Sequence, residues 1–362
     1  MKNYTQFILY KENLLHNLDM IRSYTSKKIC IMVKADGYGY GMINIAKILD
    51  KKVDFFGVAN GEEALKLRAN NIKTKILVCG IAKDNLIPHL IKNKISIACN
   101  SLTFMKRIEK VATKLKLKVL LHLVVNSGMN RLGVKNEKRL KEMVDYAKDS
   151  KYLILEGVFT HTGFSELQNK DKMKIQFKHF IKMVKYADFP IDTCIHFSNS
   201  GAFSYGKDYH CDMVRIGKII YGVNPNYVRK KFNLNPIFAL KTKVIQTQEV
   251  KKGENIGYGE NLVALSDTKV GILPIGYGDG FISYYVGNEV MIKGKKYKIL
   301  SICMDLTIIE IDDNVKEKDS VLVIGKDGKD IIPVTEYSTK SHNVPSQVVA
   351  NFNKNRFDIV VI

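Results

Sequence analysis

The sequence has no tryptophan, only 7 prolines and no pair of cysteines in a CxxC arrangement. Its 6 cysteines are scattered and mostly lie inside apolar runs, so we expect free thiols rather than disulfides or a metal site, and a reducing cytoplasm as the location. No apolar run is long enough to span a membrane, and the stretch FILY near the start is too short for a signal peptide. These absences argue against a disulfide-bonded secreted protein and against a membrane-spanning one.

Acidic residues are scarce relative to basic ones. The sequence has 36 Asp and Glu against 57 Lys and Arg, which gives a formal net charge of +21. Such a charge can attract nucleic acid, an anionic membrane or an acidic ligand. The lysines are spread along the whole chain, however, and no basic block is interleaved with aromatic residues. We therefore expect a solvated basic surface, no nucleic-acid or membrane partner, and a slight gain in affinity for a phosphate-bearing cofactor.

Eight apolar segments bounded by turn signals predict strands before residue 225. Most are continuous apolar runs, which is typical of strands buried on both faces of a parallel sheet. Segments with helical periodicity, such as EEALKLRAN and NEKRLKEMVDYAKDS, separate most of them. The pattern predicts an α/β fold, a (β/α)8 barrel of the TIM type, with an open doubly wound sheet as the alternative. The predicted strands are 28–35, 54–60, 74–80, 95–100, 118–126, 155–161, 193–200 and 213–222.

The pattern changes after Pro236. Strand-like runs separated by short Gly, Asp and Lys turns follow, with almost no helical periodicity, and they predict a β-rich second domain. We place the boundary near NYVRKKFNLNP, with a barrel over 1–235 and a β domain over 236–362. Roughly the first ten residues are expected to pack with the second domain. The predicted strands of this domain are 239–250, 270–278, 289–300, 303–312 and 320–325.

Residues capable of chemistry gather where the predicted barrel strands end. Five different strands end at or just before such a residue, or carry one near their end; these residues are Lys34, Arg131, His161, Ser200 and Arg215. Barrels of this type build their active sites from the loops at the carboxyl ends of the strands. The five side chains are therefore expected to meet at one mouth of the barrel.

Two interpretations fit Lys34, which ends a buried strand. It can reach solvent or pair with Asp36, as many lysines at strand ends do. Alternatively it is a Schiff-base lysine, because burial disfavours the ammonium and leaves an amine that can attack an aldehyde. Ser200, Gly201 and Gly217 belong to the last two strands and loops, where this fold usually binds phosphate through backbone amides. A reactive lysine opposite a phosphate site favours the second interpretation and indicates pyridoxal 5'-phosphate.

Eight motifs along the chain resemble, in order, those of the alanine racemase family. They are VKADGYGYG, VNSGMNRLG, FTHTGF, HFSNSGA, DMVRIGKIIYG, IGYGE, LPIGYGDGF and ICMDLTIIEI. The resemblance implies a barrel followed by a β domain, pyridoxal phosphate as cofactor, and interconversion of L- and D-alanine. It also implies a head-to-tail homodimer in which the β domain of one subunit completes the active site of the other.

The resemblance assigns the two bases that racemisation needs, since one group takes the alpha proton while another delivers a proton to the opposite face. Lys34 would bind the cofactor as a Schiff base and act as one base. Tyr258, contributed by the partner subunit, would be the other. His161 would link Arg215 to Tyr258 and help the phenol lose its proton. Arg215 would face the pyridine nitrogen, which leaves that nitrogen unprotonated and discourages transamination.

Further residues are implied to hold the cofactor and the substrate. Tyr38 and Ser200 would bind the phosphate, with backbone contributions from Asn199, Gly217 and Lys218, while Arg131 would contact the phenolic oxygen and help to hold the substrate. Met304, through its backbone amide, and Asp305 would receive the substrate carboxylate, and Tyr277 would line the entryway. His122 and His196, within apolar strands, are interpreted as structural.

Several positions depart from the family pattern, and most lie near the substrate entrance. Val124 stands where a lysine is common, Asn126 replaces an aspartate, and His342 replaces a tyrosine that narrows the site. Ser301 and Glu166 stand where an arginine and an aspartate are usual. We therefore keep a second hypothesis, in which serine or a longer amino acid is also racemised.

Three other classes of function are weighed against racemisation. A pyridoxal phosphate carrier would lack the second domain, and a decarboxylase of this fold would carry an acidic residue in place of Arg215. A basic protein that binds nucleic acid is the third, and its binding would depend steeply on salt.

Overall fold

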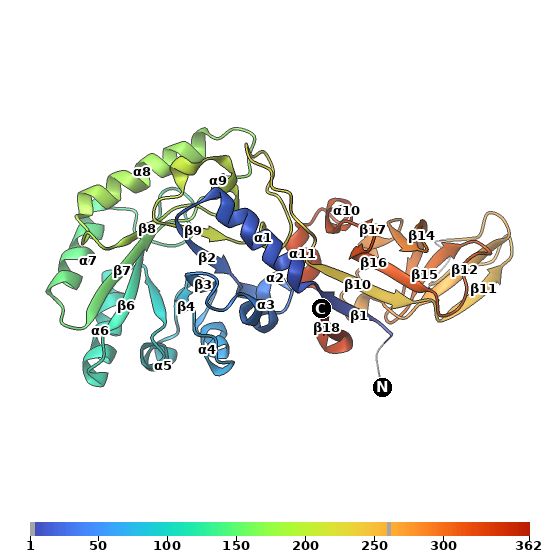
Figure 1. The fold of residues 1–362 in the computed structure, drawn as a ribbon, viewed down its shortest axis with the longest axis horizontal. Helices are drawn as coiled ribbons and strands as arrows, with labels where there is room; N and C mark the ends of the chain where they lie inside the picture. The colour runs from blue at the N-terminus through green and yellow to red at the C-terminus, as the bar shows by residue number, and fades with distance from the viewer. Residues whose placement is uncertain (1–3, 259–261) are drawn as a thin grey trace. The chain divides into compact units, whose positions relative to one another are not determined.

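The computed structural model describes residues 4–258 and 262–362, and the chain divides into two compact units (Figure 1). The first, which we call the barrel unit, consists of His16–Gly37 and Gly41–Leu234. The second, the β unit, consists of Met1–Leu15, Tyr38–Tyr40 and Asn235–Ile362.

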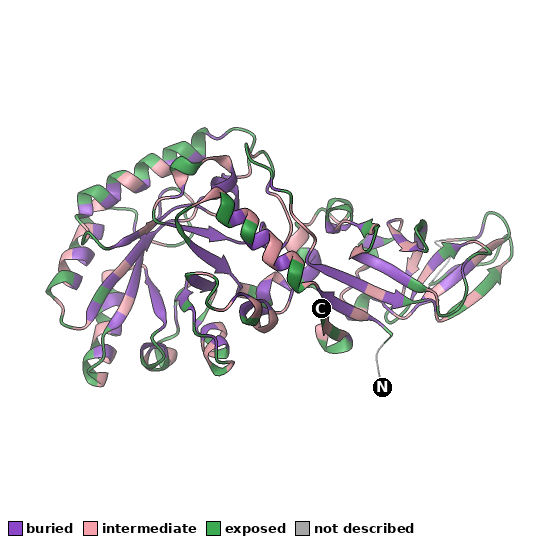
Figure 2. Cartoon of the chain, viewed as in Figure 1, coloured by how far each residue is buried: buried purple, intermediate pink, exposed green. Residues whose placement is uncertain are grey.

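Eight parallel strands form the sheet of the barrel unit, in the order β8-β7-β6-β5-β4-β3-β2-β9. Each overlaps one of the eight predicted segments, so the predicted TIM-type barrel is confirmed. The strands are almost entirely buried, as their purple colour in Figure 2 shows. Their bounds are β2 Lys28–Met32, β3 Phe55–Val58, β4 Lys75–Val78, β5 Ser96–Cys99, β6 Val119–Val124, β7 Leu153–Phe159, β8 Cys194–His196 and β9 Met213–Ile216.

A short seam between β8 and β9 nearly closes the barrel. These strands are the two ends of the sheet, and no regular ladder joins them. Instead the Asp212 amide donates to the Ile195 carbonyl at 2.9 Å, while the Ile195 amide donates to the Asp212 carboxylate at 2.9 Å. The Arg215 amide donates to the Ser198 carbonyl at 3.0 Å.

Helices lie outside this sheet (Figure 1), and the residues that they bury are mostly apolar. In α6, Phe104 and Ile108 are fully or almost fully buried, whereas Lys106 and Lys110 are exposed, as the helical period requires. Polar residues cap several N-termini; the Asn60 side chain, for example, accepts from the Glu63 amide at the start of α4. The helices are α3 Met42–Leu49, α4 Gly61–Ala69, α5 Ile87–Lys92, α6 Leu102–Leu115, α7 Glu137–Asp149, α8 Asp171–Ala187 and α9 Ser200–Tyr205, with α1 Lys11–Tyr24 passing from the β unit into the barrel unit.

The β unit is built around a 10-stranded sheet with the order β11-β12-β15-β14-β13-β16-β10-β1-β18, and β17 pairs with β16. Strand β1 lies between β10, to which it is antiparallel, and β18, to which it is parallel. The bounds are β1 Gln6–Leu9, β10 Phe238–Lys243, β11 Gln246–Val250, β12 Thr268–Leu273, β13 Glu289–Ile292, β14 Lys295–Ile302, β15 Thr307–Ile311, β16 Ser320–Asp327, β17 Asp330–Ile332 and β18 Asp358–Val361, with helices α10 Val334–Lys340 and α11 Pro345–Ala350.

Several predicted strands, among them 193–200, 270–278 and 303–312, extend beyond the observed ones, and three further segments are partly of a different structure. The segment 239–250 is two strands, because Val244 donates to Asp319 beside β16 whereas Ile245 donates to Ile272 of β12, so the chain changes partner between them. The segment 289–300 is a hairpin, whose turn places Lys293 and Gly294 at φ 50° and 78°. In the barrel unit, β9 ends at Ile216, and 217–222 is a bend and buried turns rather than strand.

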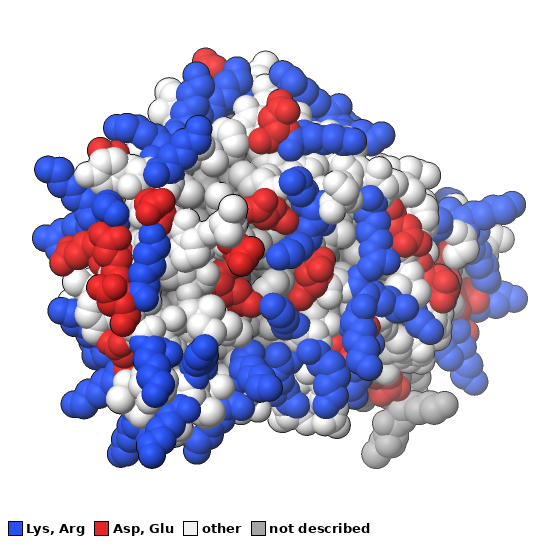
Figure 3. Space-filling view, turned by 60° about the vertical axis from the view of Figure 1, so that its left-hand side comes forward, with Lys and Arg blue, Asp and Glu red and all other residues white. Residues whose placement is uncertain are grey.

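The surface carries its positive charge in dispersed form. Lysine and arginine side chains are scattered over the face shown in Figure 3 and are interspersed with Asp and Glu. All 6 cysteines are free. Among the helices of the described residues, none is long and apolar enough to cross a membrane.

Candidate active site

Lys34 follows β2 by two residues, at the carboxyl end of the barrel sheet. Its side chain is half-buried, and burial lowers its pKa, with the positive charges of Arg131 and Arg215 acting in the same direction. A lysine of lowered pKa holds a larger fraction of uncharged amine near neutral pH. Lys34 therefore has the property that attack on an aldehyde requires.

The backbone after Lys34 forms a left-handed turn, labelled α2 in Figure 1 (Lys34–Tyr38). Ala35, Asp36, Gly37 and Tyr38 all have positive φ, between 51° and 64°. For residues other than glycine this conformation costs about 1–2 kcal/mol each, so it needs external support.

Two carboxylates give that support. Glu63 of α4 accepts hydrogen bonds from the Ala35 and Ala59 amides, both at 2.7 Å. Asp36 accepts through Oδ1 from the Met42 amide at 2.9 Å, and so holds the far end of the turn at the start of α3. Glu63 thus ties the turn that carries Lys34 to the neighbouring β3–α4 loop.

His161 lies in the cationic environment that Arg131 and Arg215 form around Lys34. His161 lies two residues after β7, and burial, together with the charges of Arg215, Arg131 and Lys34, lowers its pKa to about 3. The imidazole is therefore neutral at neutral pH. An anion such as a phenolate or a carboxylate would be stabilised in such surroundings.

Arg215 of β9 is 4% exposed and donates hydrogen bonds from both terminal nitrogens. Nη1 donates to His196 Nδ1 and to the His196 carbonyl, both at 2.9 Å. Nη2 donates to the Thr160 carbonyl at 2.6 Å and to the Phe197 carbonyl at 3.2 Å. Four terminal N–H groups thus have four acceptors, and within residues 4–258 and 262–362 no acceptor is found for the Nε–H, which leaves this donor for a bound molecule. The predicted hydrogen-bonded link from Arg215 through His161 to Tyr258 stays a prediction.

The loop that carries Arg131 is held by Asn126. Its Oδ1 accepts from the Gly128 and Asn130 amides at 3.2 and 3.0 Å, and Ser127 bonds Thr160 at 2.8 Å. Beside this loop lies a cavity of about 30 Å³, which Val124, Arg131 and His161 help to line. Arg131 is exposed, and the apolar side chain of Val124 has no acceptor for a hydrogen bond from it.

Ser200 and Gly217 come together where a phosphate site was predicted. The Gly217 amide donates to Ser200 Oγ at 2.9 Å, at the N-terminus of α9. Asn199 caps this helix by accepting from Ala202 at 3.0 Å. Lys218 pairs with Glu166 at 2.8 Å, which leaves its charge partly neutralised. A hydroxyl, a helix N-terminus and glycine backbone at one place fit a phosphate group.

Tyr38 belongs to the left-handed turn after Lys34, where its φ is 56°, and it is counted with the β unit.

Three predicted substrate residues of the β unit, Tyr277, Met304 and Asp305, lie on two adjoining loops. The Tyr277 amide donates to the Cys303 carbonyl at 3.0 Å, and the Gly278 amide donates to the Met304 carbonyl at 2.8 Å. Arg356 binds Asp305 at 2.7 Å and Asp279 at 2.6 Å, which fixes the base of both loops. Among the described residues, none accepts a hydrogen bond from the Met304 amide, so that amide is available to a carboxylate.

Tyr258 and His342 lie elsewhere in the β unit. Tyr258 is 70% exposed and follows Gly257, whose φ of 82° brings its backbone close against the short side chain of Ser301. The longer side chain of an arginine at position 301 would not fit in this close contact with Gly257. His342 is exposed at the end of α10, with φ 53°.

Two functional features escaped the sequence analysis. Glu63 shows only as a helix residue in sequence, and its tie to Ala35 spans 28 positions. His196 was interpreted as structural, yet it accepts a hydrogen bond from Arg215. In the sequence, the feature that points to this contact is a histidine inside an apolar run, on the predicted strand that precedes the strand of Arg215.

Comparisons with known proteins cover nearly the whole chain. Residues 10–225 match the model of the alanine racemase N-terminal domain, and residues 237–360 match that of the alanine racemase C-terminal domain. Alanine racemase 1 of Caldanaerobacter subterraneus is 30% identical over 97% of this chain and 93% of its own length. Alanine racemase of Borreliella burgdorferi is 35% identical over 92% of each chain. The structure of an alanine racemase from Clostridium difficile 630 superposes with a TM-score of 0.94 at 31% identity, covering 100% of this chain and 96% of the other.

Proposed function

The chain belongs to the alanine racemase family, and from this membership we propose that it is a pyridoxal-phosphate-dependent enzyme that interconverts L- and D-alanine. The observation that carries the proposal is Lys34, half-buried at a strand end with a lowered pKa, beside Arg131 and Arg215. Ser200 and Gly217 supply the phosphate-binding end. Both parts of the cofactor, its aldehyde and its phosphate, thus have chemically matched residues.

Bound pyridoxal phosphate would supply an aldehyde that condenses with amines and a ring that acidifies the alpha carbon of an amino acid. The residues of the chain do the rest. Lys34 takes or returns the alpha proton on one face, because its amine is uncharged when it acts as a base. Arg215 would offer its Nε–H to the ring nitrogen and, as a permanent cation, would not give up a proton to it. Asn199, Ser200, Gly217 and Lys218 hold the phosphate, with Tyr38.

We assign the second base to Tyr258, with Met304 and Asp305 receiving the substrate carboxylate and Tyr277 and His342 beside the entrance. All five belong to the β unit, and we propose that they act in the active site of a second copy in a head-to-tail homodimer. Tyr258 at 70%, Met304 at 52% and Tyr277 at 43% exposure present large apolar surface, which supports a docking role. We further propose a cytoplasmic enzyme whose D-alanine serves the cell wall.

Racemisation of serine or a longer amino acid is a second candidate. Its support is the short side chain of Ser301, which lies directly against Gly257 beside Tyr258. A larger side chain at position 301 would leave less space for substrate beside Tyr258.

The first experiment incubates the purified protein with pyridoxal phosphate and separate L-amino acids in heavy water. NMR follows loss of the alpha-hydrogen signal, and chiral chromatography follows the enantiomer ratio. Exchange and inversion of alanine alone support the proposal, and equal or faster reaction of serine supports the second candidate. No exchange with any amino acid would overturn both.

Shared active sites are tested by mixing two inactive variants, Lys34→Ala and Tyr258→Phe. A mixed dimer contains one site with both native bases, so random exchange of subunits should restore about a quarter of the wild-type activity. Absence of recovery in a sample shown to contain mixed dimers would contradict the head-to-tail arrangement.

A further inference from the structure

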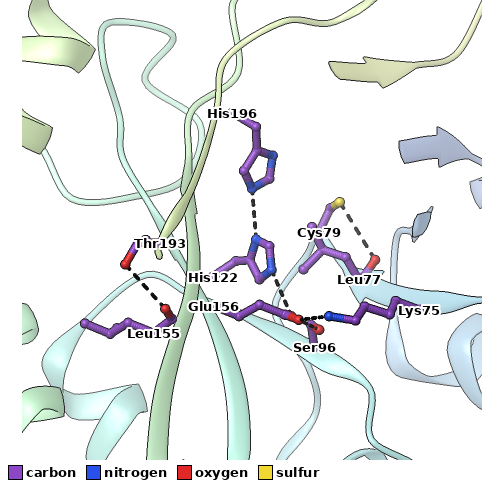
Figure 4. Close-up of polar contacts among 9 residues, drawn as sticks. All are labelled: Lys75, Leu77, Cys79, Ser96, His122, Leu155, Glu156, Thr193 and His196. Atoms are coloured by element: carbon purple, nitrogen blue, oxygen red, sulfur yellow. Dashed lines mark hydrogen bonds and ion pairs between the residues drawn. The ribbon is translucent and has the colours of Figure 1, made fainter. Parts of the chain in front are cut away.

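A line of polar side chains runs through the barrel sheet from Glu156 through His122 to His196 (Figure 4). A hydrogen bond from Arg215 to His196 continues it. His196 at the end of β8 bonds His122 of β6, with 2.8 Å between His196 Nε2 and His122 Nδ1. His122 Nε2 in turn lies 3.1 Å from Glu156 Oε2 on β7. Both histidines are 0% exposed. Polar side chains in such a place are costly unless every hydrogen bond is made.

The direction of every hydrogen bond in this line follows from Arg215. A guanidinium can only donate, so His196 Nδ1 must be the acceptor of the bond from Nη1 and carries no proton. The proton of neutral His196 is therefore on Nε2 and is donated to His122 Nδ1. By the same reasoning His122 carries its proton on Nε2 and donates it to Glu156.

The Glu156 carboxylate closes the line as an anion. Ser96 Oγ donates a hydrogen bond to Oε2, and Lys75 Nζ lies 2.9 Å from Oε1. Burial alone would raise the pKa of Glu156, but the hydrogen bonds from His122 and Ser96 lower it to about 2. Burial lowers the pKa of both histidines, which keeps them neutral. A cation at one end and an anion at the other are thus joined by two neutral rings.

The backbone is shaped to admit this line. In the pairing of β6 with β7, Leu121 faces Leu155 and His122 faces Gly157, so Glu156 is an extra residue in a β-bulge. Bulges redirect the side chain of the extra residue. At Gly157 a Cβ atom would clash with the His122 ring, so the absence of a side chain leaves the ring its place.

We propose that Glu156, His122 and His196 form a positioning relay that fixes the orientation of the Arg215 guanidinium through one-way hydrogen bonds. The relay holds Nη1 so that Nε–H keeps a constant direction. This proposal rests on the proposed function in one respect, which is that Arg215 faces the ring of the bound cofactor. The three residues act through Arg215 and are therefore positioning residues.

The first test is made on the apoprotein with ¹⁵N-labelled histidine. His122→Asn and His196→Asn variants assign the two signals, and long-range ¹⁵N–¹H spectra at neutral pH report the tautomers. Both rings should carry the proton on Nε2 alone. A proton on Nδ1 of either ring, or a doubly protonated ring, would overturn the relay, whatever the enzymatic activity proves to be.

The second test compares relay variants in the cofactor-loaded enzyme. His122→Phe removes both hydrogen bonds and should lower kcat about tenfold, shift the absorption band of the bound cofactor and raise the frequency of transamination relative to racemisation. His122→Asn keeps an acceptor for His196 and should recover part of each effect. Glu156→Gln removes the charge and should change the spectrum in the same direction as His122→Phe.

The matched control is His210→Asn. His210 is also buried, at 2% exposure, but it bonds Thr25 and the Phe203 carbonyl and has no part in the line to Arg215. It should leave the spectrum and the transamination ratio unchanged. Should His122→Phe fail to fold, His122→Asn and Glu156→Gln decide the matter. Wild-type spectra and ratios in all folded relay variants would contradict the proposal, whereas an inactive wild type with Nε2 tautomers would contradict the proposed function alone.

Discussion

Replacement of Glu63 by glutamine should loosen the turn that carries Lys34. The Glu63 carboxylate accepts from Ala35 and Ala59, both at 2.7 Å, and each oxygen takes one amide. Glutamine has a single acceptor oxygen, and its NH₂ group would face the second amide. One hydrogen bond to a charged group is therefore lost and one backbone donor is left unpaired.

The expected cost follows from these two changes. A hydrogen bond to a charged group contributes about 1.5–3 kcal/mol, so we expect a destabilisation of about 2 kcal/mol. For a unit of this size that loss lowers the melting temperature by roughly 4–8 °C. Because removal of the Glu63 charge also lowers the pKa of Lys34 further, the affinity for pyridoxal phosphate should change as well.

Scanning calorimetry of the apoprotein and absorption titration with pyridoxal phosphate measure these effects. The control is Glu62→Gln, the same chemical change at the adjacent position, where an exposed carboxylate pairs with exposed Lys83. Such surface pairs contribute little, so no measurable change is expected. If Glu63→Gln melted with the wild type and bound the cofactor equally well, the support that we assign to Glu63 would be refuted.

Three further predictions concern His161, Arg356 and His342. Folding lowers the pKa of His161 from 6.5 to about 3, so between these pH values the unfolded chain binds more protons, and the free energy of unfolding declines as the pH is lowered. In urea titrations the His161→Asn variant should lose less of this free energy over the same pH range. Equal pH dependence of the free energy of unfolding in the variant and the wild type would contradict this. Arg356→Met frees the Asp305 carboxylate and should raise KM for alanine about fivefold with little change in kcat, whereas a fall in kcat alone would argue against substrate positioning. His342→Tyr should narrow the range of amino acids racemised, and an unchanged substrate profile would end the hypothesis of a widened entrance.

The barrel strands could be predicted because their cause is local. Continuous apolar runs such as KICIMV can be buried on both faces only in a sheet covered by helices. The same criterion failed at 217–222, where Ile219, Ile220 and Tyr221 are buried in a turn. Apolar composition reports burial, and it does not distinguish a buried strand from a buried turn.

Features that depend on distant partners could not be predicted. The left-handed turn places Ala35 and Asp36, neither of them glycine, at positive φ because Glu63 and Met42 hold it. The line from Glu156 to Arg215 joins strands β7, β6, β8 and β9 and depends on one bulge. The local sequence around a buried histidine does not indicate which residue of another strand it will bond.

The position of β1 between β10 and β18 has a consequence for biosynthesis. The register pairs Phe7 with Leu240 and with Ile359, so the partners of β1 are translated about 230 and about 350 residues after it. At bacterial or eukaryotic elongation rates, the first partner follows after roughly 10–50 s. Phe7 and Leu9, which end fully buried, must meanwhile remain in an unpaired apolar segment. The nascent chain therefore carries an unpaired apolar strand segment while the barrel unit is being synthesised. The sheet of the β unit is the last part of the protein that can be completed.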